Sequence, residues 1–183
     1  LGFVAYAGSL SGKFVWDDAS SILLHEHVKD PSKAVQLFRE DQHAFGRGEG
    51  NFYRPLLPLS FMVDYLFAHT PETLGIPPSF RPPEVGPFLF HITSTLWHIA
   101  AALLLFALMT RLGATATVRI LVVLVYVLHP LHTEAVAYIS GRADSMAAAF
   151  MFAGLTLSVG DPRSPRRGLS IIFASWCFIF GLL

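Results

Sequence analysis

The residues most capable of chemistry lie close together in one segment of an otherwise apolar chain. His129, His132, Glu134, Arg142 and Asp144 bring two imidazoles, two carboxylates and a guanidinium into a single stretch. Ionisable groups at the edge of a bilayer are costly, so they are usually paired or functional. We expect these side chains to line a cavity for a polar headgroup rather than to bind zinc. Arg142 either neutralises Asp144 or binds a phosphate.

A second group of polar residues follows the first apolar segment directly. Asp17 and Asp18 are adjacent carboxylates, which repel each other unless a cation, a metal or hydrogen bonds hold at least one of them. Such a pair just outside a membrane helix can take a proton from a hydroxyl nucleophile and can help to hold a divalent ion with phosphate oxygens. The structural alternative is that Asp18 caps a helix starting at Ala19.

Three further polar side chains are candidates for a site. Arg54 follows a tyrosine and precedes a predicted helix, so it either contacts phosphate in a bidentate manner or anchors that helix at the membrane surface. His91 and His98 are seven residues apart and therefore share one face of a helix. Histidines in a bilayer helix normally face the interior of the bundle, so interior hydrogen bonding is favoured over metal binding.

Composition indicates the class of protein. The chain has 183 residues, of which 53% are hydrophobic and 14% are charged, whereas a soluble domain carries about 25% charged residues. We therefore expect an all-α polytopic membrane protein in contact with lipids, and the formal net charge of zero gives no sign of a nucleic-acid partner. Cys177 lies in an apolar run and is expected to be a buried apolar residue. Both ends lie in apolar sequence, from which we expect a single-domain portion of a longer protein.

The apolar segments predict the membrane spans. A spanning helix needs about 20 residues, and only the second segment reaches that length without its flanks. The long loop 13–86 carries 7 Lys or Arg against 10 Asp or Glu, whereas the connections at 110–117 and 160–168 are basic. Basic connections are expected on the cytoplasmic side, so the loop 13–86 and the segment 129–144 share the opposite face. The expected spans are about 1–12, 87–110, 118–130, 143–160 and 169–183.

The long loop contains its own predicted elements. Asp30–Glu40 is typical of a helix with Asp30 as its N-cap and Pro31 at its first position. Pro58–Phe67 is typical of an amphipathic helix at the membrane interface. We expect a turn at Gly46–Gly50 and an irregular connection at Thr70–Pro87.

Three motifs occur in the order found in one known family. Phe14-Val-Trp-Asp-Asp18, Tyr53-Arg-Pro-Leu56 and the segment 129–144 together resemble the transmembrane and tetratricopeptide-repeat protein O-mannosyltransferases and their bacterial relatives. These are polytopic glycosyltransferases of the GT-C class, and the resemblance covers roughly residues 12–159. It implies a polyprenyl or dolichyl phosphate sugar donor, with mannose as the sugar. It also implies transfer with inversion to a Ser or Thr hydroxyl of an acceptor protein on the periplasmic or lumenal face.

The resemblance also implies roles for individual residues. By the position of the motif, Asp17 is the general base and Asp18 is its neighbour. By position, His132, Glu134 and Arg142 would line the donor pocket. Arg54 and Asp144 are further candidates for substrate binding, and no metal ligand is assigned among these residues.

The resemblance has one departure that affects function. Members of the family have about ten or more spans, and many carry C-terminal repeats, whereas four to five spans and no repeats are expected here. We therefore expect this N-terminal portion alone to be inactive. The alternative is a non-catalytic transmembrane subunit, derived from such an enzyme, that packs with other membrane subunits. A bacterial inner membrane is favoured over the endoplasmic reticulum.

Overall fold

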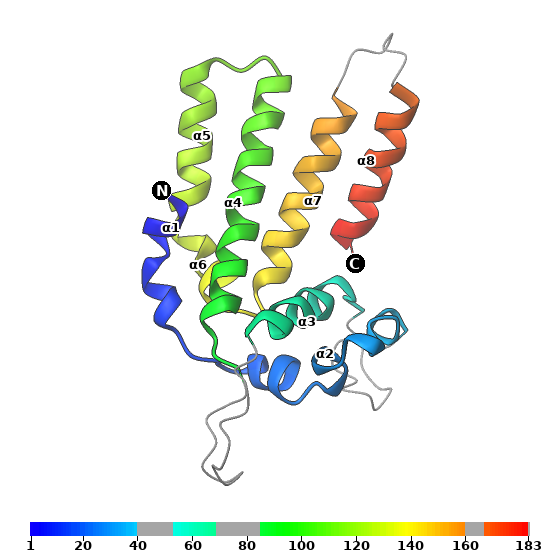
Figure 1. Cartoon of the computed structure of the whole chain (residues 1–183). Coiled ribbons are helices and arrows are strands. Elements are labelled where there is room, and N and C mark those ends of the chain that lie inside the picture. The colour runs from blue at the N-terminus through cyan, green and yellow to red at the C-terminus, as the bar shows by residue number, and fades with distance from the viewer. Residues whose placement is uncertain (40–52, 69–84, 160–166, 183) are drawn as a thin grey trace, which may run out of the picture. The chain divides into compact units, whose positions relative to one another are not determined.

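The fold is helical throughout the part of the chain that the structure, a computed structural model, describes: residues 1–39, 53–68, 85–159 and 167–182. Every regular element in these ranges is a helix or a helical turn, which confirms the all-α class (Figure 1). The chain divides into two compact units. One contains residues 1–9 and 94–183, and the other contains residues 10–93.

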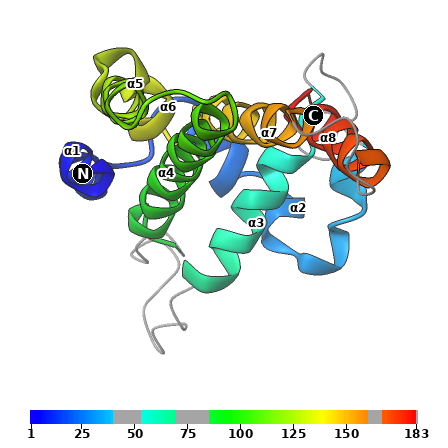
Figure 2. The same cartoon turned by 90° about the horizontal axis from the view of Figure 1, so that it is seen from above.

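The first unit is built from long apolar helices. Figures 1 and 2 show that α5 returns antiparallel to α4 and that α8 returns antiparallel to α7. Gly154 lies where α7 and α8 pack, because a Cβ there would lie 3.2 Å from the Ala174 carbonyl oxygen and 3.2 Å from the Phe178 ring. The helices of this unit are α1 (Gly2–Ala5), α4 (Phe88–Arg111), α5 (Ala116–Leu128), α6 (Thr133–Ala137), α7 (Arg142–Ser158) and α8 (Arg167–Leu182), and α4 begins in the other unit.

The predicted spans correspond to these helices to different extents. Helix α4 has 24 residues and is long and apolar enough to cross a membrane. Helix α5 and the following segment Pro130–Ala137 form a second candidate only if this pair, bent by 48°, counts as one span. The predicted segments at 143–160 and 169–183 form α7 and α8, which have 17 and 16 residues. In the described part of the chain, α4 is thus the one helix that meets the criteria of length and composition for a membrane span without being joined to a neighbour.

The predicted first span, 1–12, is instead two short helical pieces. Helix α1 ends after four residues, and a tighter turn follows at Ala7–Ser11. The Ser9 hydroxyl donates to the Tyr6 carbonyl oxygen at 2.7 Å. Serine side chains that bond nearby backbone carbonyls compete with regular helix formation, which accounts for the interruption.

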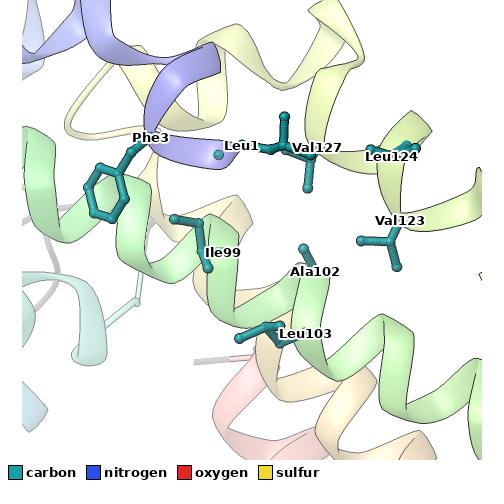
Figure 3. A pocket seen from close by; sticks show the side chains of 9 residues that line it. Leu1, Phe3, Ile99, Ala102, Leu103, Val123, Leu124 and Val127 are labelled. Carbon is teal, nitrogen blue, oxygen red and sulfur yellow. The ribbon is translucent and has the colours of Figure 1, made fainter. Parts of the chain in front are cut away.

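Helix α1 packs tightly against α4. A Cβ on Gly2 would lie 2.7 Å from Cγ1 of Ile99, so a larger residue there would force the Ile99 side chain or the helix to shift. Beside the contact is an apolar cavity of about 210 Å³ between α1, α4 and α5 (Figure 3). It is lined by Leu1, Gly2, Phe3, Ile99, Ala102, Leu103, Val123, Leu124 and Val127.

Two arginines make hydrogen bonds at the α4–α5 turn and at the end of α7. Arg119 donates to the Thr110 hydroxyl at 3.0 Å across the α4–α5 turn, and its guanidinium lies 5.3 Å from the centre of the Phe106 ring. Arg111, at the end of α4, donates to the Val159 carbonyl oxygen at 3.3 Å, just after α7. A cation near a helix C-terminus satisfies free carbonyls and complements the helix dipole.

The second unit contains shorter elements. Its helices are α2 (Glu26–Lys29), α3 (Leu56–Ala68) and the start of α4, with single helical turns at Ala19–Leu23, Pro31–Lys33 and Gln36–Phe38. The prediction of one continuous helix at Asp30–Glu40 is wrong. Over the described residues it is two separate turns, because backbone bonds such as Ala34 N–H to Pro31 and Arg39 N–H to Gln36 close at three residues rather than four.

The predicted cap at the start of this segment is confirmed. The Asp30 carboxylate accepts from the Ser32 hydroxyl at 2.7 Å and from the Ser32 backbone N–H at 3.0 Å. These two hydrogen bonds hold the pKa of Asp30 below its usual value. The turn predicted at Gly46–Gly50 and nearly all of the predicted Thr70–Pro87 loop lie outside the described residues.

The helix predicted at Pro58–Phe67 is confirmed as α3, but its polarity differs from the expected pattern. Its single acidic residue, Asp64, is buried, whereas Leu66 and Phe67 are 50% and 79% exposed. The Asp64 carboxylate accepts from the Thr93 hydroxyl at 2.8 Å, which links α3 to the start of α4. This helix therefore has a polar hydrogen bond on its buried side and apolar residues on its exposed side, and its position at a membrane interface stays a prediction.

We expect Thr93→Val to destabilise this unit. Valine has the shape of threonine but takes away the donor to Asp64, and weakening the satisfaction of a buried carboxylate costs about 1–3 kcal/mol. Thermal unfolding of the complete protein in detergent measures the effect. Thr93→Ser keeps the hydroxyl and should melt close to wild type, and equal melting of the valine and serine variants would contradict a role for this bond.

Candidate functional site

The two predicted catalytic carboxylates occupy one tight turn in the second unit. The Asp18 backbone N–H donates to the Val15 carbonyl oxygen at 3.0 Å, and the Val15 N–H donates back to Oδ2 of Asp18 at 3.1 Å. Asp18 is completely buried, whereas Asp17 is exposed. Of the pair, Asp17 is therefore the carboxylate that can meet a substrate from solvent.

The predicted capping role of Asp18 is corrected by this geometry. Asp18 does precede the helical turn Ala19–Leu23, but its side chain makes no capping hydrogen bond to that turn. Its carboxylate points back to Val15. The Ser20 hydroxyl donates to the Asp17 carbonyl oxygen at 2.9 Å at the start of the helical turn.

Arg54 lies in the same unit, two residues before the start of α3. It is exposed, and its carbonyl oxygen accepts from the Leu57 N–H at 3.2 Å in the first turn of the helix. The preceding Tyr53 donates its hydroxyl to the Phe38 carbonyl oxygen at 2.8 Å, which connects this motif to the segment before it. Arg54 is thus an exposed guanidinium on an anchored backbone.

The histidine segment of the first unit forms a helix boundary, as predicted. Helix α5 ends at Leu128, and His129 turns the backbone to an extended conformation. Nδ1 of His129 accepts from the Leu131 N–H at 3.2 Å, which caps the turn Pro130–His132. The imidazole of His129 therefore stabilises this turn by capping it.

Three aromatic rings pack together next to this boundary. His98 stacks on Tyr126 with ring centres 4.9 Å apart and planes at 16°. His132 lies 5.1 Å from His98 and 4.5 Å from Tyr126. His91 and His98 are both buried, in agreement with an interior position on α4. The exposed side of the cluster opens to a groove of about 380 Å³ lined by Leu105, Val122, Val125, Tyr126, His129, Leu131 and His132.

Arg142 opens α7, as predicted, and is completely buried. Its Nε donates at 3.0 Å to the hydroxyl of Ser94, which is buried on α4. The Ser145 hydroxyl donates to the Ala135 carbonyl oxygen at 3.3 Å and joins α7 to α6. The guanidinium is therefore held inside the unit by the helices around it.

Gly141 permits the close approach of α6 to the start of α7. A Cβ at this position would lie 2.5 Å from the Glu134 carbonyl oxygen and 3.1 Å from that of Tyr138. The side chains of Glu134 and Asp144 themselves are exposed. Within this unit Arg142 is buried, whereas Glu134 and Asp144 are exposed.

Some residues of these clusters cannot be recognised as site residues from the sequence. Ser94 and Ser145 are ordinary helix residues whose partners lie far along the chain, 48 and 10 residues away. Tyr126 looks like one more apolar residue of a span. The predicted residues Asp17, Asp18 and Arg54 lie in one unit, and His132, Glu134, Arg142 and Asp144 lie in the other.

The described residues hold no group of three His, Cys, Asp or Glu side chains arranged to bind a metal ion. The histidines nearest each other are engaged in ring packing and in a backbone cap.

The described residues thus form an all-helical fold with an apolar helical unit and with polar groups near the ends of its helices. Comparison with known proteins then shows what this sequence resembles. It is 29% identical over 185 residues to protein O-mannosyl-transferase tmtc2 of Xenopus laevis, covering 98% of this chain and 20% of the relative. It is 31% identical over 192 residues to protein O-mannosyl-transferase Tmtc2 of Drosophila melanogaster, covering 96% of this chain and 18% of the relative.

A third relative gives the same result. A protein O-mannosyl-transferase of Caenorhabditis elegans is 29% identical over 165 residues, covering 87% of this chain and 22% of the relative. The resemblance to the transmembrane and tetratricopeptide-repeat O-mannosyltransferases is therefore confirmed over most of this chain. The chain spans about a fifth of the length of these relatives. No family model and no solved structure matches it.

Proposed function

We propose that this chain forms part of a membrane glycosyltransferase that moves mannose from a polyprenyl or dolichyl phosphate to a Ser or Thr hydroxyl of a protein. The observation that carries the proposal is the similarity to named protein O-mannosyl-transferases along 87–98% of the chain. The chain corresponds to about a fifth of those relatives, so the activity is proposed for the complete protein that contains it.

The chemistry assigned to the chain is a single displacement. The acceptor hydroxyl oxygen attacks C1 of the sugar while Asp17 takes the hydroxyl proton, and the bond between C1 and the phosphate oxygen breaks. A new bond forms between C1 and the acceptor oxygen, and the lipid phosphate leaves from the opposite side with inversion at C1. The exposure of Asp17 suits a base that must meet a protein acceptor.

Cationic groups complete the proposed chemistry. The departing lipid phosphate carries negative charge, which fixed cations stabilise more strongly as it develops. Arg54 is exposed and has the fork geometry for bidentate contact with phosphate. Arg142 is buried and donates to the Ser94 hydroxyl at 3.0 Å, so its proposed role is to stabilise the phosphate through its charge. We assign both to the donor, together with His132, Glu134 and Asp144.

We further propose a polytopic arrangement in the membrane. Helix α4 is long and apolar enough to form one of the proposed spans. Helices α7 and α8 have 17 and 16 residues, about 25 Å at 1.5 Å per residue, so they cross a core of about 30 Å only with flanking residues. The named relatives come from animals, so the bacterial location expected from sequence receives no support and is not proposed.

The choice of donor tests the function. Membranes containing the complete protein are given a Ser- and Thr-containing peptide with either dolichyl phosphate mannose or GDP-mannose, both carrying labelled sugar. Labelled peptide is expected from the lipid-linked donor, with no dependence on GDP-mannose once endogenous synthesis of the lipid-linked form is blocked. Transfer from GDP-mannose under that block would overturn the assignment of a lipid-phosphate donor.

A further inference from the structure

Two carboxylates of one sequence motif lie in opposite environments. Asp18 is 0% exposed, whereas the adjacent Asp17 is exposed. The carboxylate of Asp18 accepts from the Val15 N–H, and the Asp18 N–H donates to the Val15 carbonyl oxygen. This reciprocal pair of bonds joins the first and last residues of the turn and leaves Trp16 and Asp17 at its tip.

The backbone at the tip needs such a lock. Trp16 has φ of +49°, a left-handed conformation that is uncommon for a residue with a bulky side chain. Residues held in sparsely populated backbone regions cost on the order of 1–3 kcal/mol and persist only where surrounding interactions hold them. The indole is 86% exposed, so packing of Trp16 itself supplies little of that hold.

The residue before the turn is also fixed. The Phe14 ring meets the buried Phe90 ring edge-on, with centres 5.5 Å apart, and Phe90 in turn contacts Phe61 of α3 at 6.2 Å. The chain therefore enters the turn from a packed aromatic anchor. The turn closes on the buried Asp18, so its two ends are fixed within the same unit.

We infer that the two carboxylates have different tasks, Asp18 being a positioning residue that locks the Val15–Asp18 turn so that Asp17 alone meets the acceptor hydroxyl. This inference rests on the proposed function, which it refines by removing Asp18 from the reacting groups. The hydrogen bond from the Val15 N–H needs an acceptor oxygen at position 18 and does not itself need a negative charge. Asparagine can accept the same hydrogen bond through its Oδ1 atom. We therefore expect asparagine to substitute functionally for Asp18 but not for Asp17.

The test compares Asp18→Asn, Asp18→Ala and Asp17→Asn in the complete protein. Asp18→Asn is expected to transfer sugar within about tenfold of wild type, because it keeps the hydrogen bond to Val15. Asp18→Ala is expected to fall by ~10²-fold through misplacement of Asp17. The acidic limb of the pH–rate profile should persist in Asp18→Asn and disappear from the residual activity of Asp17→Asn.

A second readout does not depend on transfer. Hydrogen exchange at the Val15 amide should stay slow in Asp18→Asn and become fast in Asp18→Ala. Equal losses of transfer in Asp18→Asn and Asp17→Asn, with Val15 still protected in both, would overturn the inference because Asp18 would then act through its charge. The two ideas can fail separately. If the wild-type protein transfers no sugar from the lipid-linked donor, but the Val15 amide exchanges slowly in Asp18→Asn and fast in Asp18→Ala, the proposed function is refuted and the structural role of Asp18 is retained.

Discussion

Asp17→Asn in the complete protein is expected to slow sugar transfer by roughly 10²- to 10⁴-fold, the usual contribution of a general base. Asparagine has nearly the size of aspartate but cannot take the hydroxyl proton. Asp17 is exposed, and its backbone carbonyl contact with Ser20 does not involve the carboxylate, so the fold should be retained. The measurement is the rate of peptide mannosylation at saturating donor, with melting temperature recorded on the same sample.

A matched control lies in the same unit. Glu26 is also an exposed carboxylate, and it begins α2 outside the motif. Glu26→Gln makes the same change of charge and should leave the transfer rate within about twofold, since surface substitutions away from a site have small effects. Undiminished transfer by Asp17→Asn would refute the assigned base.

Gly141→Ala is expected to destabilise the protein by about 1–3 kcal/mol, the usual cost of overpacking. The added Cβ would lie 2.5 Å from the Glu134 carbonyl oxygen and 3.3 Å from Cα of Ala135, and backbone atoms cannot rotate away as a side chain can. The start of α7 must then separate from α6, which should also weaken the bond between Ser145 and Ala135. Thermal unfolding in detergent measures the loss.

Gly8→Ala is the control for this prediction. It lies in the same unit, and a Cβ there would meet nothing within 4 Å. The Gly8 variant should melt close to wild type. Equal melting temperatures for the Gly141 variant and wild type would show that α6 and α7 do not pack as the structure describes.

The sequence predicted the long helices well because their signals are local. Apolar runs set the bodies of α4, α5, α7 and α8, and Pro130 and the Gly141–Arg142 step mark a helix end and a helix start. The short elements were harder to predict. A cap and a proline favoured one helix after Asp30, but backbone bonds closing at three residues divided it into turns.

For the candidate site, the sequence indicates which residue types are present but not the environment of each side chain. Charge in an apolar chain singled out Asp17, Asp18 and Arg142. The sequence distinguishes Asp17 from Asp18 only through the resemblance, and the fold shows that Asp18 is buried and Asp17 is exposed. The partner of Arg142 was unpredictable because Ser94 lies 48 residues away and resembles any other helix serine.

The central claim is that a lipid phosphate leaves as a protein hydroxyl gains mannose, and the most direct measurement counts both products of one reaction. Purified complete protein in liposomes is given dolichyl phosphate mannose and a Ser- and Thr-containing peptide, and mass spectrometry quantifies the modified peptide and the released dolichyl phosphate. The account predicts equal amounts of the two products, with the hexose attached to a Ser or Thr oxygen. Release of dolichyl phosphate with free mannose and no modified peptide, or attachment of the hexose to a nitrogen atom, would contradict it.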